Sequence, residues 1–369
     1  MATYNGARFL REQLDSIATQ TVLPAELVVT DDGSTDDTLS IVRAFAETAP
    51  FPVHIHENPV RLGYRGNFIR NMGLCTSELI ALCDQDDVWE PNKLARASEP
   101  FGDPDVLLSY HESWLIDSAG KRIELVRMLL LADRNAPSSV FPMRNPYGFA
   151  MVFRRRLLDF SDLWEKSVDN LQLKERMAHD QWVFFLASAL GTVAFIDEPL
   201  AGYRQHDNNT YGFGRPAPTL RARFDDWMTV RSQDYAKFTV AAEKRAWILE
   251  QLSGRLDPAW RARADLAIER YRALVRHSAL RAAIYGPTSL AGRLQAWLDL
   301  LRDGGYGSST RWLFGRKAAL KDFFYLILPR WLVGALLLPR QGSHGTPSHG
   351  AGSPSSSDGV GGTAAASGS

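Results

Sequence analysis

The feature that most constrains this chain is a cluster of acids that directly follows a short apolar run. Leu79-Ile80-Ala81-Leu82-Cys83 has the pattern of a buried strand, and Asp84-Gln85-Asp86-Asp87-Val88-Trp89 comes next. Carboxylates held close together raise each other's pKa, so the cluster is costly without a cation. Mg²⁺ and Mn²⁺ favour such hard oxygen ligands and also bind diphosphates, although a lone D-x-D is more often a solvated acidic turn.

Alternating strand and helix patterns surround this cluster. A short β-branched run at 26–30 and an alternating pattern at 53–56 indicate strands. Residues 8–17 have the apolar spacing of a helix, and 63–74 resembles a loop that enters a helix. Such repetition predicts an α/β domain with a mixed, mostly parallel sheet sandwiched by helices. Further strands are expected at 79–83, 106–110, 148–153 and 193–196, further helices at 39–45, 91–97 and 179–190, and a polar loop from 199.

Three polar side chains follow predicted strand ends. Asn5, Asp32 and Asp84 each lie just past such an end, where open α/β sheets bind their ligands. We therefore expect these residues to converge on one cleft. The loop that contains Asn5 normally follows a strand, so we also expect the given sequence to begin inside its first strand.

The composition of the chain changes near residue 215. Long stretches rich in Ala, Arg and Leu follow, with helical spacing and without a further strand pattern. The last part is rich in Gly and Ser, which predicts disorder. The expected regions are an α/β domain at 1–215 with a truncated first strand, a helical region at 216–340, and a disordered tail at 341–369.

A basic and apolar segment lies near the end of the helical region. Residues 323–338 are strongly apolar but are interrupted by Pro329 and Arg330, so they fall short of the roughly 20 apolar residues of a spanning helix. Basic residues crowd the same segment, as in segments that lie in a membrane interface. We expect either peripheral membrane contact or packing on the preceding domain.

Charge and cysteine content exclude some classes of protein. Lys and Arg number 42, as do Asp and Glu, and this net charge of +0 argues against binding of nucleic acid through bulk positive charge. Cys75 and Cys83 lack C-x-x-C spacing, which indicates a reduced, cytoplasmic environment. No apolar segment of a signal peptide follows Met1.

Six short motifs, each weak alone, occur together in this chain. They are Thr3-Tyr4-Asn5-Gly6, Asp31-Asp32-Gly33-Ser34-Thr35-Asp36, Leu62-Gly63 with Asn67-Phe68, Asp84-Gln85-Asp86-Asp87-Val88-Trp89, His179-Asp180-Gln181-Trp182 and Tyr203-Arg204-Gln205-His206. In this order, over roughly residues 1 to 212, they resemble the family 2 nucleotide-sugar glycosyltransferases of GT-A fold, and most closely their rhamnosyltransferase-like branch. The helical remainder resembles that group only loosely.

The resemblance implies a nucleotide-sugar site. The loop of Thr3, Tyr4 and Asn5 would hold the nucleotide together with Asp32, which would accept a hydrogen bond from a pyrimidine N–H. Asn67 would lie beside the diphosphate. The donor implied is dTDP-rhamnose or a UDP-sugar.

The resemblance also implies a metal and a base. Asp86 would ligate Mg²⁺ or Mn²⁺, and Asp84 would touch the ribose or the coordination shell of the metal. His206 would approach the metal or the diphosphate from the far side. Asp180 matches the position of the catalytic base in this group.

Asp32, Asp180 and His206 each have a simpler interpretation. Asp32 occurs in a turn that commonly caps a helix. Asp180 suits the first turn of a helix, where the macrodipole favours an acid. His206 fits a loop histidine with satisfied hydrogen bonds equally well.

The residue types fit sugar transfer without the family name. A cation stabilises the leaving diphosphate, and a separate carboxylate takes the proton of the acceptor hydroxyl on the opposite face of the sugar, which predicts inversion. We expect a sugar, with rhamnose as one candidate, to be moved to a cell-surface glycan or lipid-linked acceptor in the cytoplasm or at the inner face of the membrane. Nucleotidyl transfer and a catalytically inactive, membrane-associated scaffold stay open as alternatives.

Overall fold

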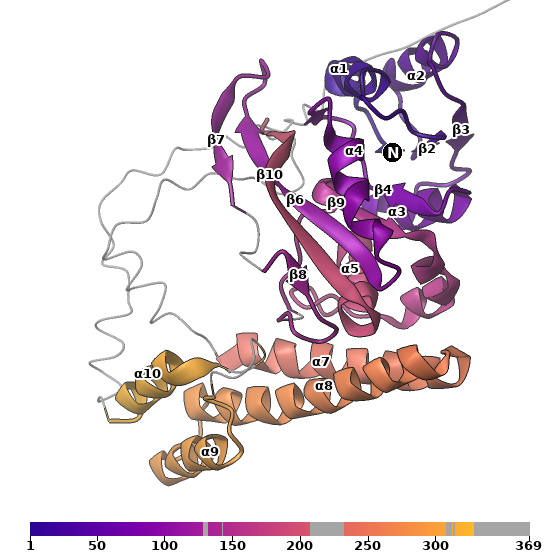
Figure 1. Cartoon of the computed structure of the whole chain (residues 1–369). Helices are drawn as coiled ribbons and strands as arrows, with labels where there is room; N and C mark the ends of the chain where they lie inside the picture. Colours follow the sequence, from indigo (N-terminus) through magenta and orange to yellow (C-terminus); the bar gives the residue numbers. More distant parts are fainter. Residues whose placement is uncertain (128–131, 142, 207–231, 308–311, 313, 328–369) are drawn as a thin grey trace, which may run out of the picture. The chain divides into compact units, whose positions relative to one another are not determined.

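A computed structural model describes residues 1–127, 132–141, 143–206, 232–307, 312 and 314–327 (Figure 1). Its strands are β1 (Ala2–Thr3), β2 (Leu27–Asp31), β3 (Val53–Glu57), β4 (Leu79–Ala81), β5 (Val88–Trp89), β6 (Val106–Ile116), β7 (Arg122–Val126), β8 (Arg134–Asn135), β9 (Met151–Arg154) and β10 (Thr192–Arg204). Its α-helices are α1 (Ala7–Ala18), α2 (Thr38–Ala46), α3 (Gly63–Leu74), α4 (Lys93–Ser98), α5 (His179–Leu190), α7 (Ser232–Leu252), α8 (Pro258–Tyr285), α9 (Leu290–Arg302) and α10 (Gly315–Ile327). The 3₁₀ turns are η1 (Glu99–Gly102), η2 (Gly148–Ala150), η3 (Arg155–Lys166) and η4 (Ser253–Arg255).

The first sheet is parallel and has the order β1-β2-β3. All residues of β2 are buried, as expected for a strand covered on both faces. Helix α1 buries Leu10, Leu14 and Ile17, which lie on one face because of their helical spacing. Because β1 and β2 run parallel with Thr3 opposite Asp31, the loops that follow both strands leave the same edge of the sheet.

The second sheet is mixed and has the order β4-β9-β6-β10-β5, with β7 added to β6 and β8 to β10. Strands β6 and β10 run side by side and parallel (Figure 1), while the other pairings in this sheet are antiparallel. The predicted α/β class with a mixed sheet and flanking helices is therefore confirmed. The sequence overstated the parallel share, because apolar runs do not distinguish the direction in which a strand pairs.

The strand predicted at 193–196 is longer in the structure, because β10 continues to Arg204 through the segment that was expected to lead into a polar loop. Ala201 and Gly202 pair with β5, and Ile116 of β6 packs so closely on Gly202 that an added Cβ would lie 2.9 Å from it. This extension carries Tyr203 and Arg204 to the acidic loop that follows β4.

Helices follow the α/β part in the described chain. Asp257 caps helix α8, since its side chain accepts a hydrogen bond from the backbone N–H of Trp260. Helix α8 lies beside α7 (Figure 1). The ring of Tyr271 on α8 packs edge-on against Phe185 of α5 at 5.9 Å. This contact joins the helical layer to the helix that carries Asp180.

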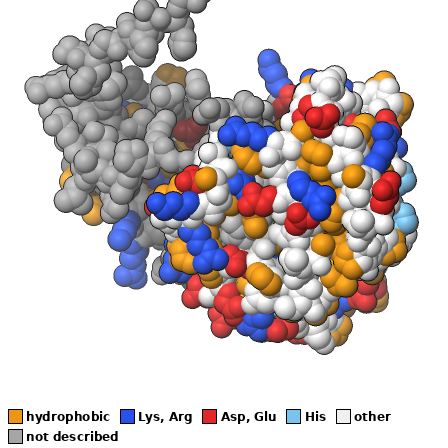
Figure 2. Space-filling view, turned by 90° about the horizontal axis from the view of Figure 1, so that it is seen from above, with side chains coloured by type: hydrophobic (Ala, Val, Ile, Leu, Met, Phe, Trp, Pro, Cys, Tyr) orange, Lys and Arg blue, Asp and Glu red, His pale blue; other side chains and the backbone are white. Residues whose placement is uncertain are grey.

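Part of the predicted organisation lies outside the described residues. This holds for the boundary near 215, for residues 328–338 of the basic apolar segment and for the tail at 341–369. Each helix within the described ranges is too short or too polar to span a lipid bilayer. Peripheral membrane contact stays a prediction. Basic and acidic side chains are interspersed over the face shown in Figure 2, in agreement with the net charge of +0.

Candidate active site

The loops that follow β1, β2 and β4 contact one another, as their positions at strand ends predicted. The backbone N–H of Tyr4 donates to the Gln85 side chain at 2.9 Å, and the Gln85 amide donates back to the Tyr4 carbonyl at 3.1 Å. The N–H of Asn5 donates to Ser34 at 2.9 Å, and the Asn5 side chain accepts from the N–H of Thr35 at 2.8 Å. Asn5 adopts φ 47°, a left-handed conformation that asparagine tolerates better than most residues.

Asp32 is 3% exposed and its carboxylate is already occupied by hydrogen bonds. One oxygen accepts from the Asn58 amide at 2.9 Å and from the N–H of Leu62 at 2.7 Å. The other accepts from the N–H of Gly63, the first residue of α3, at 2.8 Å. The carboxylate thus stabilises the positive end of α3, whereas the simpler interpretation of this motif concerned the capping of the helix that directly follows it, α2. The predicted bond to a pyrimidine N–H stays a prediction.

The other residues predicted for the nucleotide differ in exposure. Thr3 is buried and its hydroxyl donates to Asp31 at 2.9 Å. Asn67 is also buried, and its amide donates to two backbone carbonyls at the ends of β1 and β2. Both side chains therefore hold the strand ends together. Tyr4 is 37% exposed, and the Arg61 guanidinium lies 3.9 Å from its ring centroid, so the Tyr4 ring is accessible to the base of a nucleotide.

The acidic loop after β4 brings like charges together. Burial, together with the charges on Asp86 and Asp180, raises the pKa of Asp84 to about 7. Asp87 is fully buried, and burial together with the charges of Asp86 and Asp84 holds its pKa well above the ordinary value. Like charges in this loop therefore disfavour one another's ionisation.

Asp86 and His206 form the pair best suited to a divalent cation. The Asp86 carboxylate lies 2.8 Å from Nε2 of His206, and both side chains are partly exposed. Among the residues that the structure describes, no group of three His, Cys, Asp or Glu side chains is placed to hold a metal alone. One carboxylate and one imidazole still fit Mg²⁺ or Mn²⁺, since Mg²⁺ usually keeps several waters and takes the rest of its ligands from substrate phosphates.

Arg204 is a site residue to which the sequence motif gave no role. Its side chain is fully buried, and it donates to the carbonyls of Asp86 at 2.8 Å, Asp117 at 3.1 Å and Ser118 at 3.2 Å. It also pairs with Glu12 of α1 at 2.5 Å. The arginine therefore ties the acidic loop to the segment of Asp117 and Ser118 and to α1. An arginine at the end of an apolar strand was the available signal, because a buried guanidinium must find several acceptors.

Lys93 is a second buried cation that sequence reasoning missed. Its ammonium donates to the carbonyl of Phe149 at 2.7 Å and lies 3.9 Å from the ring of Trp89. Burial lowers its pKa to about 7, while the charges of Cys83, Asp87 and Asp84 act to raise it. Its place in α4, shortly after the acidic loop, was the only signal in the sequence.

Asp180 lies in the first turn of α5, as predicted. Its carboxylate accepts from the Asn145 amide at 2.9 Å and from the N–H of Gln181 at 2.7 Å. Burial raises the pKa of Asp180 to about 6, and these hydrogen bonds act in the opposite direction. Its neighbour His179 stacks on Phe68 at 3.8 Å, and burial lowers the pKa of that imidazole to about 3, so it is neutral.

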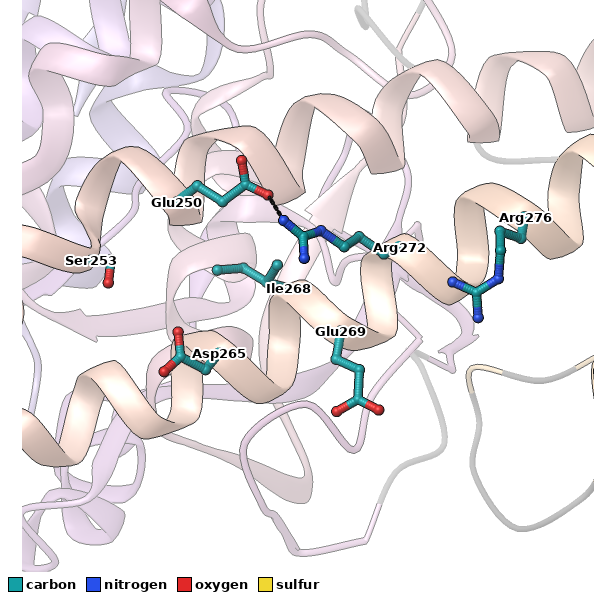
Figure 3. Close-up of a pocket in the computed structure, with 7 residues that line it drawn as sticks. All are labelled: Glu250, Ser253, Asp265, Ile268, Glu269, Arg272 and Arg276. Atoms are coloured by element: carbon teal, nitrogen blue, oxygen red, sulfur yellow. Dashed lines mark hydrogen bonds and ion pairs between the residues drawn. The ribbon is translucent and has the colours of Figure 1, made fainter.

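A separate groove of about 480 Å³ lies between α7 and α8 (Figure 3). Glu250 and Arg272 form an ion pair at 2.7 Å across it. None of the predicted site residues lines this groove, and its walls carry charges of both signs, so it is not the candidate active site. The lining residues are Glu250, Ser253, Asp265, Ile268, Glu269, Arg272 and Arg276.

Comparisons with known proteins agree with the resemblance. The model of the family described as Glycosyl transferase family 2 matches residues 1–160. An uncharacterized glycosyltransferase of Nostoc sp. is 29% identical over 219 residues, which cover 57% of this chain and 65% of that protein. A dTDP-rhamnosyl transferase of Shigella flexneri is 26% identical over 251 residues, which cover 64% of this chain and 81% of that protein. The chain thus spans somewhat less than two thirds of the length of the Nostoc relative.

Solved structures show more distant likeness. The crystal structure of S. aureus TarS in complex with UDP is 16% identical with a TM-score of 0.43, and the match covers 83% of this chain and 91% of that chain. A mannosyltransferase from Pyrobaculum calidifontis in complex with GDP-Man and Mn²⁺ is 20% identical with a TM-score of 0.40, over 91% of this chain and 84% of that chain. Likenesses of this size do not bear on the substrate or the metal. Residues 1–160 thus match the model of glycosyl transferase family 2, and the α/β architecture with acids at the strand ends agrees with the resemblance to that family.

Proposed function

We propose that this chain is an enzyme that transfers a sugar from a nucleotide-diphosphate donor to a hydroxyl group and requires Mg²⁺ or Mn²⁺. One arrangement carries the proposal. Asn145 bonds Asp180 at 2.9 Å, the nearby Tyr147 ring stacks on Tyr203 at 5.5 Å, and the next residue, Arg204, bonds Asp87 of the acidic loop at 3.1 Å. Sugar transfer needs a cation at the leaving diphosphate and a separate base at the acceptor hydroxyl, within one site. The acidic loop after β4 provides carboxylates for the cation, and Asp180 provides the base.

The cation would be held by Asp86 and His206, with Asp84 at the ribose or in the outer coordination shell. The 2.8 Å separation of the Asp86 carboxylate from Nε2 of His206 supports this assignment. When bound, the cation stabilises the negative charge that develops on the leaving diphosphate. Tyr4 and Arg61 offer an exposed aromatic and cationic surface to the nucleotide base.

Asp180 acts as the base. With a pKa of about 6 it is mostly deprotonated at pH 7, and the Asn145 amide orients its carboxylate. The acceptor oxygen forms a bond to the anomeric carbon and its proton moves to Asp180. The bond between the anomeric carbon and the diphosphate oxygen breaks, and the electron pair leaves with the nucleoside diphosphate. A single displacement from the opposite face inverts the anomeric configuration.

The first donor to test is dTDP-rhamnose, because the relative from Shigella flexneri bears the name of a dTDP-rhamnosyl transferase. UDP-sugars and GDP-sugars follow. We assign the acceptor to cell-surface glycans or lipid-linked precursors, made in the cytoplasm or at the inner face of the membrane.

A donor screen tests this function. Purified protein is incubated with dTDP-rhamnose, UDP-sugars and GDP-sugars, with Mn²⁺ or with EDTA, and the products are separated. Release of a nucleoside diphosphate that depends on Mn²⁺ and is lost in Asp180→Asn supports the proposal. Release of a nucleoside monophosphate or pyrophosphate would indicate nucleotidyl transfer, and nucleotide binding without turnover of any donor would indicate an inactive scaffold.

A further inference from the structure

Three aromatic rings stack beside the proposed base. The Tyr147 ring lies 5.8 Å from Phe149 and 5.5 Å from Tyr203, and Phe149 lies 4.9 Å from Tyr203, with interplanar angles of 10°, 24° and 14°. Phe149 and Tyr203 are buried, whereas Tyr147 is 36% exposed. Tyr147 is therefore the accessible member of a stack whose inner rings are fixed by the core.

The stack connects the segment of Asp180 to the acidic loop after β4. Next to Tyr147, an added Cβ at Gly148 would lie 3.4 Å from Cβ of Asp180, and Asn145 donates to the Asp180 carboxylate at 2.9 Å. On the other side, the residue after Tyr203 donates its backbone N–H to Asp87 at 3.1 Å. Tyr147 thus belongs to a short loop that packs on the base, and its ring partner belongs to the strand that braces the acidic loop.

The second exposed aromatic residue of the site serves the other substrate. Tyr4 is 37% exposed, bonds to Gln85 of the acidic loop and carries the Arg61 guanidinium 3.9 Å from its ring. In the proposed function this pair faces the nucleotide. Tyr147 instead belongs to the loop that packs against the segment of Asp180, where the acceptor hydroxyl must arrive.

We propose that Tyr147 is a stacking platform for the acceptor, and that the acceptor is a sugar whose ring lies on the Tyr147 face; this inference rests on the proposed function. The polarised C–H groups on one face of a pyranose are attracted by the negative face of an aromatic ring. A fixed ring beside the base also holds the reacting hydroxyl in one orientation, which is the main benefit of positioning. An acceptor without a ring, such as a polyol phosphate, gains little from a flat platform.

Kinetics with defined acceptors test the platform. The probes are dTDP-rhamnose, or the donor found in the screen, together with octyl glycosides of rhamnose, glucose, galactose and N-acetylglucosamine, with glycerol 3-phosphate and octanol as ringless acceptors. We expect Tyr147→Ala to raise the KM for octyl glycosides by about threefold to tenfold, the size of one aromatic contact. The KM for the donor and its slow hydrolysis by water are expected to stay at the parent value.

Two variants separate stacking from structural damage. Tyr147→Phe keeps the ring, so its acceptor KM is expected to match that of the parent. Leu266→Ala removes a large side chain of similar exposure, 39%, from α8 and is expected to change neither KM. Saturation-transfer NMR of the same octyl glycosides measures binding without turnover, and the signal is expected in the parent and in Tyr147→Phe but to be weakened in Tyr147→Ala.

Several results would overturn the platform. They are a change in donor KM instead of acceptor KM, an unchanged acceptor KM and NMR signal in Tyr147→Ala, or faster transfer to glycerol 3-phosphate than to every glycoside. If the parent hydrolyses a donor but neither binds nor uses any glycoside, this inference fails while the proposed function stands. If the parent hydrolyses no donor at all, the proposed function fails and the platform fails with it.

Discussion

Two groups of acids follow buried strands in this protein, and they are held in opposite ways. The carboxylates of Asp31, the last residue of β2, and of Asp32, the next residue, accept hydrogen bonds from backbone N–H groups, including those of Ser34 and Gly63. The acids after β4 instead lie close to one another, and the charge on Asp180 adds to their repulsion. The same residue type at the same place in the topology therefore has two different environments.

This difference separates acids that support the fold from acids that support chemistry. A carboxylate saturated by N–H groups stabilises the loop that surrounds it. Carboxylates that raise each other's pKa destabilise the folded state at neutral pH and are retained where a cation or a proton must bind. Changes after β4 and at Asp180 should therefore affect activity, and changes after β2 should affect stability.

The largest effect is expected for Asp180→Asn. The variant keeps the shape of the side chain but cannot accept a proton, so the rate of sugar transfer should fall by about 10²–10⁴-fold. Its stability at pH 7 should not fall, because a pKa raised to about 6 means that the ionised acid is disfavoured in the folded protein. Transfer rates and urea unfolding at pH 7 measure both. A variant with parental turnover would remove Asp180 from the reaction.

The next largest effect is expected for Arg204→Lys, which tests the residue that holds the acidic loop in place. Lysine cannot reach all the carbonyls that Arg204 bonds, so unfolding free energy should fall by about 3 kcal/mol. Glu12→Gln is the matched control, since it weakens only a half-exposed ion pair and should cost about 1 kcal/mol or less. Equal losses in the two variants, measured by urea unfolding, would show that the carbonyl bonds contribute nothing.

A smaller loss of stability is expected for Asp32→Ala. The N–H groups of Leu62 and Gly63 lose their acceptor, which should lower the unfolding free energy by about 1–3 kcal/mol. Asp37→Ala is the control, because Asp37 is exposed and makes no capping bond, and its change should stay within about 0.5 kcal/mol. If Asp32→Ala is as stable as the parent but no longer binds nucleotide, Asp32 supports ligand binding and not the fold, which contradicts the comparison.

The last and most gradual effect is a dependence of kcat/KM on pH. Because the pKa of Asp180 is raised to about 6, the base is ionised above that pH and protonated below it. The value of kcat/KM should therefore fall about tenfold per pH unit below pH 6. A profile that stays flat down to pH 4.5 would contradict a base with this pKa.

The sequence predicted most of the fold because the elements have clear apolar spacing and sharp ends. The contacts between the loops that contain Asn5, Asp32 and Asp84 also followed from their positions after strands. Spacing could not show which of these side chains are saturated, since the partners of Asp32 come from residues about 26 to 31 positions away. The buried cations Arg204 and Lys93 were missed for the same reason, because their partners are carbonyls of distant segments.

The most direct test of the central claim is the binding of a nucleoside diphosphate with and without metal. In isothermal titration of UDP and dTDP, the parent should bind much more tightly with Mn²⁺ than with EDTA. Asp86→Asn should bind nucleotide with the same affinity in both conditions, because its metal site has lost the carboxylate that faces His206. If Asp86→Asn binds nucleotide with the same Mn²⁺ dependence as the parent, the acids after β4 do not hold the cation.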